Sequence, residues 1–127
     1  MNQQKLSEQV SISGQIEIDD IAELARDGVE VLVCNRPDGE SVDQTPYAEI
    51  EAAAKNAGME TFNIPFTGGS LTEAKVREFA EVIKTGKRLH AYCRTGNRCG
   101  IIFNASRELV PASHSDDQAS AAQKKSP

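Results

Sequence analysis

Short apolar runs alternate with segments of helical periodicity along this chain of 127 residues, and this alternation constrains the fold more than any other feature of the sequence. The length and apolar character of the runs are typical of buried strands. The predicted strands are 10–13, 29–34, 59–64 and 89–92, and the predicted helices are 18–25, 47–57, 70–84 and 98–110. Such an alternation predicts an α/β sandwich with a mainly parallel central sheet of about four to five strands.

Capping residues support the predicted ends of the helices. Gly28 follows a helical segment in the position of a helix C-cap, and Pro46 stands at a helix start. Ser70 and Glu73 form a capping-box pattern. These signals place the helices between the apolar runs.

The end of the chain differs from the rest. Residues 111–127 are rich in Ser, Ala, Asp, Gln and Lys and, apart from Pro111 and Pro127, contain no apolar residue larger than alanine. Such a segment cannot bury enough apolar surface to offset the entropy of ordering it. We therefore predict one domain over residues 1–110 and a disordered tail over residues 111–127.

The last predicted strand runs directly into the loop Cys93-Arg94-Thr95-Gly96-Asn97-Arg98, and a helix-like segment follows. Backbone N–H groups of such a loop and the helix N-terminus favour a thiolate over a thiol, as do Arg94 and Arg98. Gly96 permits the positive φ that the loop requires. Ligands of parallel α/β sheets bind beyond the carboxyl ends of the strands. We therefore predict that Cys93 is a nucleophile and that Arg98 reaches a bound anion. The predicted anion-binding residues are Arg94, Thr95, Gly96, Asn97, Arg98 and Cys99.

Composition argues against several other functions. The net charge of −5 at pH 7 implies no basic face for nucleic acid, so the loop arginines suit a small anion such as thiosulfate, a persulfide or a phosphoester. The three cysteines form no disulfide framework, and Cys93 and Cys99 with His90 lack a fourth zinc ligand nearby. We expect no metal and no cofactor. Residues 1–13 contain no apolar signal core, and no stretch approaches the ~20 apolar residues of a membrane span, so we expect a cytoplasmic protein without a membrane partner.

Two enzyme classes use a cysteine loop of this kind, and the loop length separates them. Tyrosine and dual-specificity phosphatases place five residues between cysteine and arginine, in a cradle that fits a tetrahedral phosphate. Rhodanese sulfurtransferases use Cys-Arg-x-Gly-x-Arg or Thr, which the stretch from Cys93 to Arg98 matches position by position. The shorter ring suits a persulfide better than a phosphoryl group.

Four motifs occur in an order that marks a known family. They are Ile12-Ser13-Gly14-Gln15, Asn35-Arg36-Pro37-Asp38-Gly39-Glu40, Ile64-Pro65-Phe66-Thr67-Gly68-Gly69 and Tyr92-Cys93-Arg94-Thr95-Gly96-Asn97-Arg98. Over roughly residues 7–110 the chain resembles the phosphatase-like domain of bacterial beta-lactamase hydrolase-like proteins, also described as a sulfurtransferase family. The resemblance implies a three-layer sandwich like that of tyrosine and dual-specificity phosphatases, with helices on both faces. It also implies a functional link to a persulfide dioxygenase, to which the family is sometimes fused.

Two positions depart from the pattern of the family. Cys99 stands where the family usually has Ser or Thr, so it is either a small semi-buried replacement or a second thiol that resolves a persulfide or sulfenate on Cys93. The loop of residues 65–70 lacks the aspartate with which phosphatases protonate the leaving oxygen. Asp38 is the best substitute acid, although a turn aspartate also bonds its own backbone.

The matched loop and the missing acid favour sulfur transfer, because thiolates and sulfite leave readily. We therefore predict a rhodanese-type sulfurtransferase that works through a Cys93 persulfide. The first alternative is a phosphatase of the dual-specificity type that forms a Cys93 phosphocysteine and uses Asp38 as its acid. The second is a non-catalytic anion-binding module, in which Cys93 keeps the pKa of a free cysteine.

Overall fold

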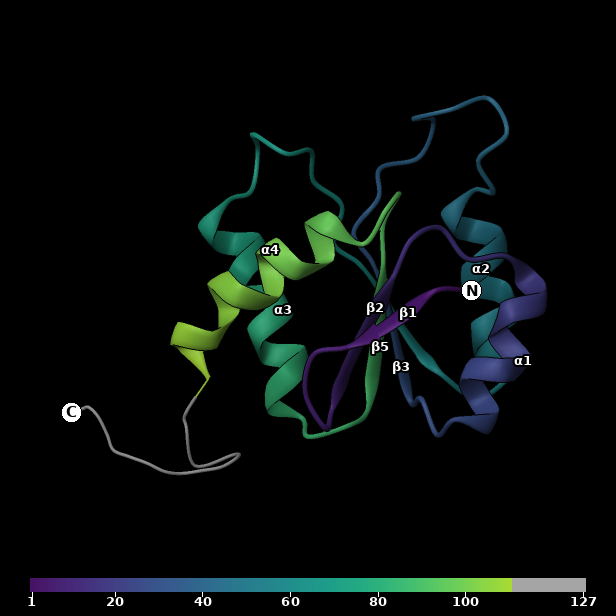
Figure 1. The fold of residues 1–127 in the computed structure, drawn as a ribbon, viewed down its shortest axis with the longest axis horizontal. Coiled ribbons are helices and arrows are strands. Elements are labelled where there is room, and N and C mark those ends of the chain that lie inside the picture. Colours follow the sequence, from purple (N-terminus) through teal and green to yellow (C-terminus); the bar gives the residue numbers. More distant parts are fainter. Residues whose placement is uncertain (111–127) are drawn as a thin grey trace.

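The computed structural model describes residues 1–110, in which a five-stranded sheet lies between two layers of helices (Figure 1). The strands are β1 (Gln3–Lys5), β2 (Val10–Ser13), β3 (Val31–Cys34), β4 (Glu60–Asn63) and β5 (Leu89–Tyr92). The helices are α1 (Ile18–Arg26), α2 (Tyr47–Asn56), α3 (Glu73–Lys84) and α4 (Asn97–Ser106), followed by the short 3-10 helix η1 (Arg107–Leu109). The predicted disordered tail lies outside the described residues, and the domain boundary at residue 110 stays a prediction.

The strand order of the sheet is β1-β2-β5-β3-β4. The neighbours β2, β5, β3 and β4 run parallel, whereas β1 pairs with β2 in the antiparallel direction. Helices α1 and α2 cover one face, and α3 and α4 cover the other (Figure 1). The predicted mainly parallel sheet with helices on both faces is confirmed.

Each face of the sheet carries its own apolar core. Strands β2, β3 and β5 are buried along their whole length, as expected of parallel strands covered on both faces. Successive side chains of a strand point to opposite faces, so Leu89 and Ala91 pack with α3 and α4 while Tyr92 packs with α1 and α2. Cys93 and Cys99 belong to the core under α3 and α4, which anchors both ends of the loop between them.

Strand β1 is missing from the sequence prediction. Its residues Gln3, Gln4 and Lys5 are polar and exposed, so the sequence shows no alternation of apolar and polar residues that would predict a strand. Pairing with β2, in the register Gln3 opposite Ser13, creates the strand. Tertiary context rather than local pattern therefore determines this edge.

The capping box predicted at Ser70 and Glu73 is wrong. Helix α3 begins at Glu73, and its N-cap is Thr72, whose side chain accepts the Lys75 backbone N–H at 3.3 Å. Ser70 instead forms a hydroxyl pair with Thr67 at 2.8 Å across the preceding turn. Helix α4 also ends earlier than predicted, at Ser106. These differences shift element ends and leave the order of elements unchanged.

The parallel strands all end at one edge of the sheet. The register aligns their last residues, Ser13, Tyr92, Cys34 and Asn63, side by side. The residues that follow are Gly14, Cys93, Asn35 and Ile64. The four motifs of the sequence therefore converge on this edge.

Two absences hold for residues 1–110. None of the helices there is both long and apolar enough to cross a membrane. The same residues contain no group of three or more His, Cys, Asp or Glu side chains that could hold a metal ion.

Candidate active site

Cys93 is the first residue after β5, and the loop that leads into α4 wraps its sulfur. Gly96, the N-cap of α4, has φ +97° and lies in the left-handed region, which confirms the sequence prediction. Its backbone N–H donates to Cys93 Sγ at 3.0 Å. The loop and the helix N-terminus therefore direct positive partial charge at the sulfur.

The pKa of the Cys93 thiol is lowered to about 5. The largest cause is a hydrogen bond from the Cys99 side chain, and backbone N–H groups of Cys99, Thr95 and Gly96 contribute further. Together these donors outweigh burial, which raises the pKa of a thiol. Cys93 is therefore a thiolate at neutral pH.

Cys99 stands at the position where the family usually has the hydroxyl of Ser or Thr. It is fully buried in the first turn of α4, and burial raises its pKa well above the ordinary value. Its thiol therefore stays protonated and acts as a donor to the Cys93 sulfur. The residue is thus a buried replacement for Ser or Thr that keeps their hydrogen-bonding ability.

Replacing Cys99 by alanine should raise the pKa of Cys93 from about 5 by roughly one pH unit. A hydrogen bond to a charged group contributes about 1.5–3 kcal/mol, and a thiol is a weak donor, so the low end of that range applies. The midpoint of Cys93 alkylation against pH measures the change. The matched variant Cys99→Ser keeps a donor and should stay close to the wild-type midpoint. Equal midpoints in all three proteins would contradict the role of the thiol.

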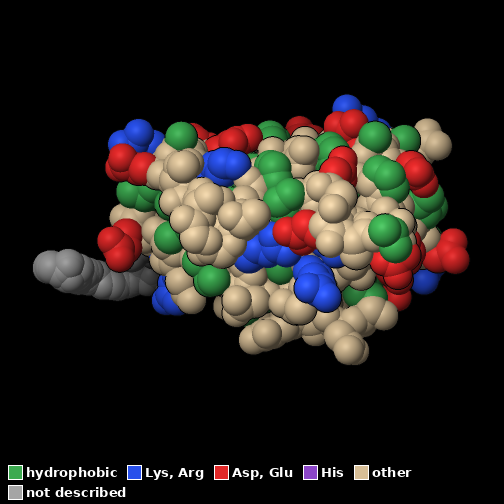
Figure 2. Space-filling model, turned by 90° about the horizontal axis from the view of Figure 1, so that it is seen from above, with side chains coloured by type: hydrophobic (Ala, Val, Ile, Leu, Met, Phe, Trp, Pro, Cys, Tyr) green, Lys and Arg blue, Asp and Glu red, His purple; other side chains and the backbone are tan. Residues whose placement is uncertain are grey.

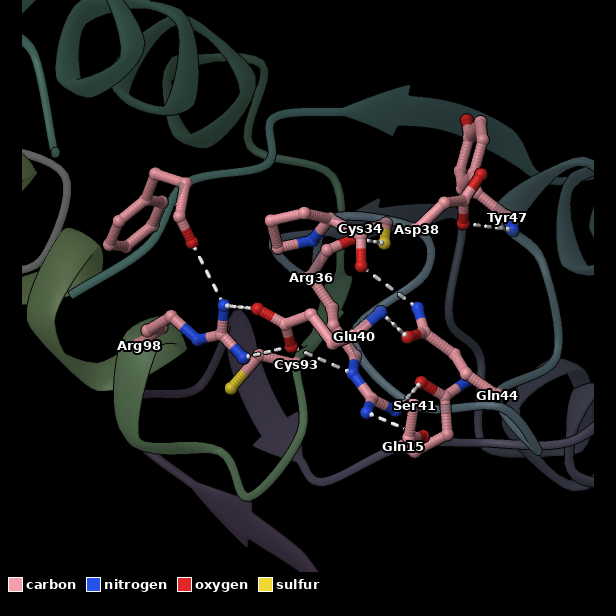
Figure 3. Close-up of polar contacts among 12 residues, drawn as sticks. Gln15, Cys34, Arg36, Asp38, Glu40, Ser41, Gln44, Tyr47, Cys93 and Arg98 are labelled. Carbon is pink, nitrogen blue, oxygen red and sulfur yellow. Dashed lines mark hydrogen bonds and ion pairs between the residues drawn. The ribbon is translucent and has the colours of Figure 1, made fainter.

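Arg98 is held beside the sulfur by a carboxylate from a distant loop. Its Nη1 and Nη2 donate to the two carboxylate oxygens of Glu40 at 2.8 and 2.7 Å, and Nη1 also donates to the Phe66 carbonyl at 3.0 Å. A guanidinium has five N–H donors, so Nε–H and one N–H of Nη2 remain. The guanidinium lies next to both the Glu40 carboxylate and the Cys93 sulfur (Figure 3). Its remaining donors form an edge that suits an oxyanion.

Glu40 also binds a second, buried arginine. The side chain of Arg36 is 4 % exposed and donates from Nε to Glu40 Oε1 at 3.0 Å. Its other nitrogens donate to Gln15 Oε1 at 2.9 Å and Ser41 Oγ at 3.3 Å (Figure 3). Hydrogen bonds from Arg98, and then from Arg36, lower the pKa of Glu40 to about 2. Glu40 therefore ties the loop after β3 to the start of α4.

Replacing Glu40 by glutamine should lower the free energy of unfolding by about 1 kcal/mol at neutral pH, since partial exposure weakens the ion pair. The folded-state pKa of Glu40 lies below its ordinary value of 4.5. Its stabilisation is therefore complete above about pH 4.5 and is lost as the pH falls toward 2. Urea unfolding of both proteins between pH 2 and 7 checks this. A difference that grows as the pH falls would contradict it.

Asp38 lies in the same loop but serves a different element. Its Oδ1 accepts the backbone N–H of Tyr47 at 2.9 Å, at the start of α2. The carboxylate is directed toward Tyr47 and away from Cys93 (Figure 3). This arrangement gives no support to the predicted role of Asp38 as an acid.

The other predicted anion-binding residues lie on the surface of the loop. Thr95 Oγ1 accepts the Asn97 backbone N–H at 3.3 Å. Arg94 is exposed, and its guanidinium has no hydrogen-bond partner among residues 1–110. On the face above the strand ends, Lys and Arg side chains lie near the middle beside an acidic group, and others lie at the rim together with most Asp and Glu side chains (Figure 2). Cationic side chains are therefore present at the centre of this face.

Strand β2 supports the loop from below, a role that sequence reasoning missed. The Ser13 carbonyl accepts the Cys93 N–H at 3.3 Å. A Cβ at position 14 would lie 2.8 Å from the Arg94 carbonyl oxygen, which requires Gly14. The position of Gly14 directly after a buried strand could have indicated this role from the sequence. His90 is buried between Ser11 and Ser13, and its two ring nitrogens lie 2.7 and 2.8 Å from the hydroxyls of these serines.

The sulfur is enclosed in this arrangement. Cys93 has no exposed surface, whereas the side chains of Arg98 and Glu40 are 13 % and 24 % exposed. A substrate reaches the sulfur only when a covering group shifts. A cleft of about 490 Å³ opens on the β1 side of the loop; Gln4, Gly96 and Asn104 line it, and Cys93 does not.

Fold and site together define a phosphatase-like α/β domain with a cysteine–arginine loop at the carboxyl ends of its strands. The chain belongs to the family described as beta-lactamase hydrolase-like protein, phosphatase-like domain, whose model matches residues 2–110. This confirms the resemblance seen in the sequence. A beta-lactamase hydrolase-like protein of Xylella fastidiosa is 31 % identical over 105 residues, which cover 82 % of this chain. The chain spans about a quarter, 24 %, of the length of that relative.

Solved structures agree with the family. A candidate phosphatase from Neisseria meningitidis is 32 % identical with a TM-score of 0.74, over 87 % of this chain and 80 % of that one. The catalytic domain of a PP-IP phosphatase from S. cerevisiae, in complex with citrate, has a TM-score of 0.66 over 86 % of this chain and 66 % of that one. At 13 % identity it shows the fold alone. These findings support an enzyme, and they support the phosphatase alternative better than the predicted sulfurtransferase.

Proposed function

We propose that this domain hydrolyses phosphoesters through a Cys93 phosphocysteine. The observation that carries the proposal is a cysteine of pKa about 5 beside the edge of Arg98 that Glu40 leaves open. The thiolate attacks phosphorus, and Arg98 and the loop N–H groups bind the phosphoryl oxygens. Water then releases phosphate from the sulfur. The citrate bound by the S. cerevisiae phosphatase of similar fold supports a small anionic substrate.

The remaining residues take supporting roles in this proposal. Arg94, Thr95, Gly96 and Asn97 line the anion site, with Arg94 free to meet a second charge of the substrate. Glu40 positions Arg98 through its paired hydrogen bonds. Cys99 stabilises the thiolate, both before attack and when the phosphocysteine is hydrolysed.

Intact-protein mass spectrometry tests the proposal. The full chain is mixed with p-nitrophenyl phosphate, quenched in acid within a turnover and compared with Cys93→Ser treated alike. A phosphoryl adduct that depends on Cys93, together with phosphate release, is the expected result. No adduct and no phosphate release from a folded protein would refute the proposal.

Sulfur transfer is the second candidate, because only four residues separate Cys93 from Arg98 and the loop of residues 65–70 carries no acid. The same experiment with thiosulfate distinguishes it through a sulfur adduct on Cys93. A link to a persulfide dioxygenase belongs to this candidate. A non-catalytic module is disfavoured, because a pKa of about 5 differs from that of an inert cysteine.

A further inference from the structure

We infer that the site takes phosphoryl donors whose leaving group departs as a stable anion, namely acyl phosphates and phosphoanhydrides, rather than alkyl phosphate esters. The inference rests on the proposed phosphatase function and names its substrate class. It follows from the groups that surround the leaving-group side of Cys93. Within residues 1–110, Glu40 is ionised, Asp38 and His90 bind other groups, and the loop after β4 carries no carboxyl.

Glu40 is the carboxylate that binds Arg98, and it is a poor acid. Both of its oxygens accept hydrogen bonds from Arg98, and Oε1 also accepts one from Arg36. Two guanidinium partners keep the carboxylate ionised at neutral pH. It therefore holds no proton to give to a leaving oxygen.

Asp38 and His90 are directed elsewhere. Asp38 binds the N–H of Tyr47 at the start of α2, on the side away from Cys93 (Figure 3). His90, the histidine among residues 1–110, has both ring nitrogens bonded to Ser11 and Ser13 in the buried sheet. Neither side chain reaches a group bound to the sulfur.

The loop after β4 faces Arg98 but presents no acid. Its Phe66 carbonyl accepts an N–H of Arg98. The hydroxyls of Thr67 and Ser70 bond to each other at 2.8 Å, and the Lys75 ammonium binds the Pro65 carbonyl. Hydroxyls and an ammonium are far weaker acids than a carboxyl at neutral pH. This loop therefore leaves the departing oxygen without a proton donor.

The bond changes explain the resulting selectivity. When Cys93 Sγ bonds to phosphorus, the P–O bond breaks and the leaving oxygen keeps the electron pair. A carboxylate or phosphate is stable with that charge, whereas an alkoxide needs a proton during bond breaking. Water then attacks phosphorus, the S–P electron pair returns to Cys93, and the proton of water stays on the released phosphate. The loop N–H groups and Cys99 stabilise the thiolate that forms.

The test compares the initial rates of the full chain on five substrates. The leaving groups of p-nitrophenyl phosphate, acetyl phosphate and pyrophosphate are stable anions. Phenyl phosphate releases a phenol with a pKa of about 10, and phosphoserine releases an alkoxide. Because a general acid contributes about 10²–10⁴-fold, kcat/KM should fall at least about 100-fold from p-nitrophenyl to phenyl phosphate and should be lowest for phosphoserine. Comparing kcat/KM for acetyl phosphate with kcat/KM for pyrophosphate decides whether acyl phosphates or phosphoanhydrides are preferred.

Two outcomes would overturn the inference. One is a kcat/KM for phenyl phosphate or phosphoserine within about tenfold of that for p-nitrophenyl phosphate, in a reaction that Cys93→Ser abolishes. That result would leave the proposed phosphatase function standing. The other is a selective loss of phenyl phosphate turnover in Asp38→Asn, or in the full chain with His114→Ala, Asp116→Asn and Asp117→Asn, which would reveal an acid. If no substrate releases phosphate through Cys93, both proposals fail together.

Discussion

Replacing Cys93 by serine is expected to lower kcat/KM for p-nitrophenyl phosphate by on the order of 10⁴-fold or more. With a pKa of about 5, Cys93 is mostly thiolate at pH 7. A serine hydroxyl in the same place remains protonated, and none of the groups described around the sulfur is a base that could activate it. The loop donors would still bind the anion, so the loss should appear in kcat far more than in KM. Phosphate release under steady-state conditions measures both.

Cys34 offers a matched control for this substitution. It is also a buried cysteine at the end of a parallel strand, but it packs in the opposite core and its thiol donates to the Arg36 carbonyl at 3.2 Å. Cys34→Ser should keep kcat/KM within a few-fold of the wild type. Thermal melts of both variants exclude unfolding as the cause of any loss. If Cys93→Ser retained its turnover, the nucleophile would have to be another group.

The sequence alone was enough to predict the layers and the position of the loop. Strands β2, β3 and β5 are buried and rich in apolar residues, so they could be found from local composition. Strand β4 is exposed or half-buried, and Met59, Phe62 and Ile64 in and beside it were the signal. Strand β1 could not be found, because Gln3, Gln4 and Lys5 become a strand only through their pairing with β2. The N-cap of α3 was misplaced because Ser70 and Thr72 carry the same local signal. Which of the two caps the helix depends on the turn that precedes it.

The partners within the site were harder to predict than the loop. Cys93 and Gly96 could be recognised because their chemistry is local. The pairing of Arg98 with Glu40 joins residues 58 positions apart, and it depends on how the loop after β3 folds over the sheet edge. The sequence offered Asp38 and Glu40 two residues apart with no rule to separate them. The structure assigns the first to α2 and the second to Arg98.

Replacing Arg98 by lysine is expected to lower kcat/KM by about 10²–10³-fold, although the charge is preserved. The planar guanidinium binds Glu40 along one edge and leaves a second edge of two N–H donors near the sulfur. An ammonium has three donors around one nitrogen and cannot bind both carboxylate oxygens and a phosphoryl group in fixed directions. Both kcat and KM should therefore change. Steady-state kinetics with p-nitrophenyl phosphate measure the two effects separately.

Arg77 supplies a control that shows what an Arg→Lys change does away from the site. It is an exposed arginine of α3 that pairs with Glu73 at 2.9 Å, so Arg77→Lys makes the same change at a surface ion pair. That variant should keep the activity of the wild type, since such pairs contribute little and Lys can replace Arg there. If Arg98→Lys also kept its activity, the planar edge would have no special role, and a point charge near the loop would suffice to bind the anion. A loss confined to Arg98→Lys would instead assign transition-state binding to the geometry that Glu40 imposes on the guanidinium.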